Sequence, residues 1–202
     1  MPGARQAGAR QAGARPSPGR PSPAERRERR ASESDPAVVL AAAVRFLESR
    51  QRSIREVRRR LGQAGYPAPL IDAAVERLEE LGFLDDEAFA RAWVESRDRA
   101  RPRGERALRS ELALKGVARE IVDRVLAERR PGDGGTAGDL ATEDAAAERL
   151  LERRGRALLR IADPRVRRNR AYALLARNGF DPDVAGRVSR AMASDEGEAG
   201  EA

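Results

Sequence analysis

A short pattern built around a glycine occurs three times in the chain and restricts its fold more than any other feature. Each glycine has a leucine four residues before it and a large apolar residue directly after it, and two further apolar positions recur five and nine residues after it. The matched positions are Gly65, Gly116 and Gly179; Leu61, Leu112 and Leu175; Tyr66, Val117 and Phe180; Leu70, Ile121 and Val184; Ala74, Val125 and Val188. The glycines lie 51 and 63 residues apart. This recurrence predicts three copies of one structural unit, with an insertion between the second and third.

The apolar residues elsewhere follow helical spacing, and no stretch shows the alternation typical of strands. Ser53 and Glu56 have the spacing of a capping box, which satisfies backbone N–H groups at the start of a helix. Asp35, Asp163 and Asp181 each precede a proline, a pair that suits a helix N-cap and first helical residue. A glycine can adopt the left-handed conformation that ends a helix. We therefore predict an all-α chain of about nine short helices, three in each copy.

The copies also define the expected domain organisation. One unit of this size cannot bury its apolar face alone, so we expect three tandem three-helix repeats to stack in an elongated array. The N-terminal arm, residues 1–34, is predicted to be disordered because it contains no aliphatic residue larger than alanine after Met1. The predicted order is a disordered Arg/Gly/Pro-rich basic arm at 1–34, repeats at 35–83 and 84–130, an acidic Gly-rich linker at 131–145, a third repeat at 146–194 and an acidic tail at 195–202.

The composition removes several classes of function. The 202 residues include no cysteine and no histidine, which excludes Cys/His zinc sites, disulfides and a histidine base. There is no Gly-rich loop that ends in Gly-Lys-Ser/Thr, so nucleotide hydrolysis is not expected. The longest uncharged apolar run, 37–44, is too short to span a bilayer, and no apolar leader follows the N-terminal arginines. We expect a cytoplasmic protein without catalytic residues, cofactor or metal.

Basic residues outnumber acidic ones by 40 to 33, which gives a net charge of +7 and a pI of about 11. They recur in and around the middle helix of each copy, so stacked copies would present a basic stripe suited to an extended polyanion. The candidate partner-binding residues are Arg58, Arg59, Arg60, Arg103, Arg106, Arg109, Lys115, Arg165, Arg167, Arg168 and Arg170. The alternative interpretation is that these are solvated helix faces without a partner.

Other polar and aromatic residues have competing interpretations. Asp85 and Asp86 form a tight carboxylate pair that could hold a metal or act as acid and base, although capping of the next helix is the simpler explanation. Lys115 stands at the end of a helix, where a cation interacts favourably with exposed carbonyls, and a partner contact is the alternative. Phe89 and Trp93 lie four residues apart, which favours an apolar pair over a platform for stacked bases.

Three segments resemble motifs of one known protein family. Residues 82–90, GFLDDEAFA, are similar to the family's GYLDDERFA segment. Residues 104–117, with Gly104 first and Lys-Gly-Val last, resemble the family's Gly-led helix that ends in Lys-Gly-Ile. Residues 175–180 resemble its closing Arg-Gly-Phe turn, with Asn178 where the family usually has a basic residue. The family is that of the RecX regulatory proteins, and the resemblance extends over residues 38–192.

The resemblance implies a non-enzymatic regulator of the RecA recombinase. Such a protein would lie as three three-helix repeats in the groove of a RecA filament on single-stranded DNA. It would mainly inhibit the ATPase, strand exchange and co-protease activity of RecA, in DNA repair and the SOS response. We expect a monomer whose partners are the RecA filament and single-stranded DNA, with no membrane contact. A general basic nucleic-acid-binding protein that acts on naked DNA is the alternative.

Overall fold

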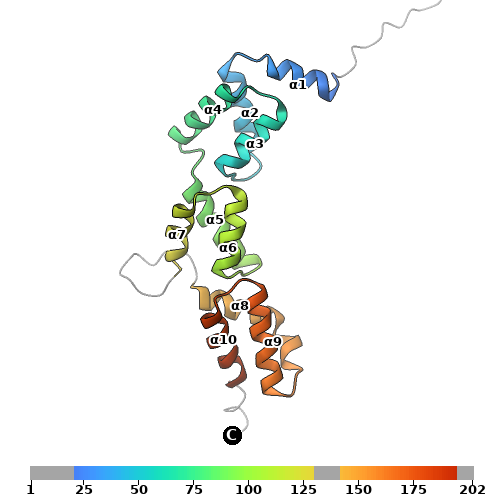
Figure 1. Cartoon of the computed structure of the whole chain (residues 1–202), viewed down its shortest axis with the longest axis vertical. Helices are drawn as coiled ribbons and strands as arrows, with labels where there is room; N and C mark the ends of the chain where they lie inside the picture. Colours follow the sequence, from blue (N-terminus) through green and yellow to red (C-terminus); the bar gives the residue numbers. More distant parts are fainter. Residues whose placement is uncertain (1–20, 130–141, 195–202) are drawn as a thin grey trace, which may run out of the picture.

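The structure, a computed structural model, describes residues 21–129 and 142–194, and within them it contains ten helices and no strand. This confirms the all-α fold class. Figure 1 shows α2 to α10 as three groups of three helices that follow one another along a single long axis. The helices are α1 (Pro23–Ala31), α2 (Pro36–Leu47), α3 (Ile54–Ala64), α4 (Ala68–Glu80), α5 (Asp86–Ala100), α6 (Glu105–Lys115), α7 (Arg119–Ala127), α8 (Glu143–Leu159), α9 (Pro164–Arg177) and α10 (Pro182–Ser194).

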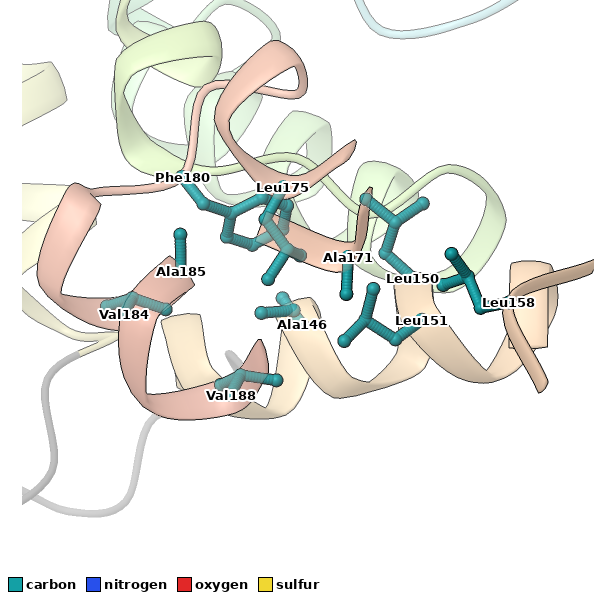
Figure 2. Packing of buried hydrophobic residues seen from close by; sticks show 11 residues of the cluster. Ala146, Leu150, Leu151, Leu158, Ala171, Leu175, Phe180, Val184, Ala185 and Val188 are labelled. Carbon is teal, nitrogen blue, oxygen red and sulfur yellow. The ribbon is translucent and has the colours of Figure 1, made fainter. Parts of the chain in front are cut away.

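Each group of three helices encloses its own hydrophobic core. The recurring leucines Leu61, Leu112 and Leu175 are each at most 2% exposed and belong to the first, second and third core respectively. Figure 2 shows the third core, where Leu175 and Phe180 lie among side chains from α8 and α10. The three-repeat array therefore has one small core per repeat, built mainly from that repeat's own helices.

The helix ends follow the predicted chemistry. Ser53 and Glu56 form a reciprocal capping box at the start of α3. Gly65, Gly116 and Gly179 have φ angles of 101°, 85° and 82°, so all three adopt the left-handed conformation. The first two directly follow the middle helix of their repeat, and Gly179 follows it after one intervening residue. Side chains other than glycine rarely adopt this conformation, which explains why the same residue type recurs at these three positions.

Part of the segment predicted to be a disordered arm is helical. Helix α1 begins in a capping box formed by Ser22 and Glu25, with Pro23 as its first residue. In the middle of α1, Arg27 lies directly against Gly65 of the first repeat. Composition alone did not reveal this helix because its stability depends on a cap and on contact with a distant turn. Residues 1–20 of the predicted arm and the predicted tail at 195–202 lie outside the described residues.

The third repeat begins three residues earlier than predicted. The Thr142 hydroxyl accepts a hydrogen bond from the Ala145 backbone N–H at 3.2 Å, and α8 starts at Glu143. Thr142 followed by two acidic residues is itself a helix-start signal, because hydroxyl caps and first-turn carboxylates both satisfy the positive end of a helix. The remainder of the predicted linker, 131–141, lies outside the described residues.

Candidate partner-binding surface

The start of each of the first two middle helices contacts the glycine turn of the next repeat. At the beginning of α3, the Ser53 hydroxyl donates a hydrogen bond to the Lys115 carbonyl at 2.6 Å. At the beginning of α6, the Gly104 N–H donates to the Asn178 carbonyl at 3.1 Å, and the Arg106 N–H donates to the Gly179 carbonyl at 3.1 Å. The same junction is therefore built twice, which fixes how successive basic middle helices are presented along the array.

An acidic residue from the following repeat completes each junction. Asp86, the first residue of α5, accepts the Ile54 N–H at 3.0 Å, and Glu143, the first residue of α8, accepts the Glu105 N–H at 2.9 Å. Ile54 and Glu105 are the first residues of their helices, so these N–H groups have no partner inside the helix. Burial raises the pKa of both acidic side chains, and the backbone hydrogen bonds partly oppose this shift.

The carboxylate pair in the sequence therefore separates into two roles. Asp85 caps its own helix by accepting the Glu87 and Ala88 N–H groups at 2.8 and 3.0 Å, as the simpler interpretation predicted. Asp86 instead joins two repeats, a role that sequence reasoning missed because its partner lies 32 residues earlier. Among the described residues, no group of three or more side chains is arranged to hold a metal ion.

Lys115 is bound inside the molecule, at the first junction. Its ammonium group lies 2.8 Å from Glu56 Oε1 and 4.8 Å from the ring centroid of Trp93. Arg50 contacts the same Glu56 oxygen at 3.1 Å. Burial alone would raise the pKa of Glu56, but the hydrogen bonds from Lys115 and Arg50 outweigh it and lower the pKa to about 2. Lys115 therefore joins the second repeat to the first through a buried carboxylate.

The predicted basic residues divide into two sets. Arg103 donates to Asn178 Oδ1 at 2.7 Å, a bond that a basic residue at position 178 could not accept. Five of the predicted residues are paired with groups of the chain itself or are buried: Arg58, Arg103, Arg109, Lys115 and Arg167. Six are exposed and form no ion pair within residues 21–129 and 142–194: Arg59, Arg60, Arg106, Arg165, Arg168 and Arg170.

The repeat itself explains why two of these arginines are paired. Arg58 forms an ion pair with Asp72, and Arg109 forms an ion pair with Asp123. In both repeats the arginine stands seven residues before the glycine and the aspartate seven residues after it. The third repeat has Tyr172 at the arginine position, so it lacks this pair. This shared spacing is the sequence signal that could have identified both arginines as intramolecular partners.

Comparison with known proteins agrees with this arrangement of repeats. A family model for the first three-helix domain of RecX matches residues 40–78, and a model for the second matches residues 85–126. Regulatory protein RecX of Mycolicibacterium vanbaalenii is 35% identical over 158 residues, which cover 78% of this chain and 84% of that protein. The chain belongs to the RecX family. Regulatory protein RecX of Chlorobium phaeobacteroides is 33% identical over 150 residues, which cover 74% of this chain and 90% of that protein.

A solved RecX structure has the same fold. The crystal structure of RecX from Lactobacillus salivarius superposes with a TM-score of 0.66 at 17% sequence identity, over 78% of this chain and 96% of that one. The two RecX family models fall on the first and second repeats, and α1 lies outside both matches. None of the helices described in this RecX family member is long and apolar enough to cross a membrane.

Proposed function

We propose that the protein binds RecA filaments on single-stranded DNA and mainly inhibits RecA ATP hydrolysis, strand exchange and co-protease activity, in DNA repair and the SOS response. Membership of a family whose relatives are named regulatory proteins supports this proposal. The observation that carries it is the elongated array, in which hydrogen bonds to backbone groups join the repeats across each junction. An extended body with a fixed arrangement of its repeats suits the long groove of a filament. Its partner would place the protein in the cytoplasm, where we propose that it acts as a monomer.

The proposed contact residues are the exposed arginines that have no acidic partner in the described part of the chain. They would meet acidic protein surface or DNA phosphates, since a guanidinium group binds either anion with two parallel hydrogen bonds. They are Arg59 and Arg60 on α3, Arg106 on α6, and Arg165, Arg168 and Arg170 on α9. The paired residues Arg58 and Arg109 and the junction residue Lys115 are proposed to support the array instead.

The test is inhibition of the DNA-dependent ATPase of RecA. The double variant R106Q/R168Q changes two proposed contacts in different repeats, and R99Q/R119Q is the matched control with the same change in charge. We expect the first variant to need about tenfold more protein for half-inhibition at ~100 mM salt, and the control to match the unmodified chain. Equal inhibition by all three proteins would contradict the assigned contacts, and no inhibition by the unmodified chain would contradict the function.

A second measurement separates the proposal from general nucleic-acid binding. Cosedimentation with RecA filaments is compared with cosedimentation with the same single-stranded DNA without RecA. The proposal requires clearly tighter binding to the filament. Comparable affinity for the two would favour a basic protein that acts on naked DNA.

A further inference from the structure

A cavity of about 560 Å³ lies between α1, α2 and α3, at the end of the array that Figure 1 shows beside the N-terminal helix. Arginines from all three helices line it. Three come from α1, one from α2 and one from α3: Arg26, Arg27, Arg30, Arg45 and Arg60. Only Arg60 belongs to the basic stripe predicted from the sequence, because the α1 arginines were expected to lie in a disordered arm and Arg45 lies on α2, outside the middle helices. The fold therefore gathers positive charge at a place that the repeat pattern did not indicate.

In the part of the chain that the structure describes, no acidic side chain lies within ion-pair distance of this cluster, and the exposed Glu25 interacts with Arg26 only through charge. The lining contains neither aspartate nor glutamate, and none of the five arginines forms an ion pair with a described residue. Arg58, by contrast, sits two residues before Arg60 on the same helix and is paired with Asp72.

Several of these side chains are already positioned by the chain. Arg30 Nη1 contacts the Ala64 carbonyl at 3.4 Å, and Arg45 Nε donates to the Ala41 carbonyl at 3.2 Å. Arg26 donates to the Pro21 carbonyl. A guanidinium group has five N–H donors, so a bond to one carbonyl leaves others for a ligand. Side chains held in this way lose less conformational freedom when an anion binds.

The aromatic residues of the cavity are covered by arginines. The Arg30 guanidinium lies 5.6 Å from the ring centroid of Tyr66, and the Arg60 guanidinium lies 5.8 Å from that of Phe46. Arg52 also lies over Phe46, at 4.2 Å. Rings that hold guanidinium groups in this way are poor platforms for bases. The cavity therefore offers charge and hydrogen-bond donors to a ligand, and it offers little for recognition of a particular base.

We propose that this cavity binds the phosphodiester backbone of a single-stranded nucleic acid without regard to base sequence. Five cations exceed what one phosphate needs, so consecutive phosphates of one strand are the ligand that matches the charge. An acidic peptide is a poorer match because the lining is mostly polar and gives little apolar contact to a peptide's other side chains. The site goes beyond the proposed regulation of RecA, since it requires no RecA, and α1 lies outside both family-model matches.

The test is direct binding of a fluorescein-labelled (dT)12 oligonucleotide to the full chain, followed by fluorescence anisotropy. The variant R26Q/R45Q removes two lining cations that make none of the contacts of α1 with Ala64, Gly65 or Tyr66. Its matched control, R29Q/R119Q, removes one exposed arginine from α1 and one from α7. We expect R26Q/R45Q to bind about tenfold more weakly at ~100 mM salt, with a salt dependence shallower by about 1.4 in log–log slope, and the control to bind as the unmodified chain does.

Three results would overturn the proposal. The first is an equal loss of affinity in the control, which would indicate attraction by overall charge alone. The second is that poly-glutamate of the same length and charge competes as effectively as unlabelled (dT)12 does, which would indicate a carboxylate partner. The third is a tenfold preference between (dT)12 and (dA)12, which would indicate base recognition. Unchanged urea unfolding of R26Q/R45Q verifies that the variant is folded. RecA is absent from the assay, so failure here leaves the proposed regulation untouched.

Discussion

Gly104 lies so close to Gly179 that a Cβ atom on Gly104 would stand 2.2 Å from the Gly179 carbonyl oxygen. The backbone of the second repeat thus meets the backbone of the third without an intervening side chain, and the Gly104 N–H donates to the Asn178 carbonyl at this point. At the first junction, a Cβ on Gly116 would stand 2.1 Å from Arg55 Cδ. Both junctions therefore depend on glycine for close approach.

Replacement of Gly104 by alanine is expected to weaken the second junction. The added methyl group collides with backbone atoms, which cannot rotate away as a side chain could, so we expect the free energy of unfolding to fall by about 2 kcal/mol or more. Urea unfolding followed by circular dichroism measures this. Gly62→Ala is the control: beyond its chain neighbours and the nearby backbone of α3, no heavy atom lies within 4 Å of its Cβ position. It should stabilise the chain by up to about 1 kcal/mol. Equal stability of the two variants would contradict the close approach.

Glu56 should make the stability of the fold depend on acid pH. Its pKa is about 2 in the folded chain and 4.5 ordinarily, so the ionised side chain contributes stability that is complete above pH 4.5. That contribution is lost as the pH falls from 4.5 towards 2. In urea unfolding between pH 2 and 7, Glu56→Gln should be destabilised at neutral pH and should lose less stability on acidification. Glu76→Gln on α4, which is exposed, should follow the unmodified chain. A parallel pH profile for Glu56→Gln would refute the assignment.

Asp86 should be needed as a hydrogen-bond acceptor more than as a charge. Burial raises the pKa of Asp86 in the folded chain above its ordinary value of 3.8. Ionisation of Asp86 therefore lowers the free energy of unfolding as the pH rises from 3.8 through the pKa of the folded state. Asp86→Asn keeps an acceptor for the Ile54 N–H and removes that cost, so we expect stability at pH 7 within about 1 kcal/mol of the unmodified chain. Asp86→Ala leaves the N–H without a partner and should cost about 1–3 kcal/mol. Unfolding free energies in urea at pH 7 distinguish the two, and the interpretation fails if alanine is tolerated as well as asparagine.

The ion pair between Arg129 and Asp98 should be the most sensitive in the described chain. The two side chains approach to 2.9 Å, and both residues are at most 5% exposed. Arg129→Met leaves Asp98 charged and buried without this partner, which is expected to cost about 3–5 kcal/mol. Arg77→Met breaks the exposed pair with Glu80 and should cost less than about 1 kcal/mol. Thermal unfolding of the two variants gives the comparison, and similar losses would contradict it.

The three repeats could be predicted from the sequence because each core uses the same spacing of leucine, glycine and a following apolar residue. The contacts at the junctions between repeats could not be predicted in this way. Ser53 and Lys115 are 62 residues apart, and periodicity within a repeat does not say which helix end meets which turn. The basic stripe was predicted from arginine positions alone, so the matching aspartates at Asp72 and Asp123 were not considered as their partners. Helix α1 was not predicted because the surface that it contacts exists only once the first repeat has folded.

The last middle helix differs from the other two in how it begins. Asp163 accepts the Arg165 and Val166 N–H groups of its own helix, at 2.8 and 3.3 Å, whereas the first N–H group of α3 and of α6 is bound by an acid from the following repeat. At the opposite end, α1 covers the turn at Gly65 that a preceding repeat would otherwise occupy. In the described part of the chain, the contacts at the two ends of the array thus differ from those at its two internal junctions, so the first and third repeats are held in place by different contacts from the second.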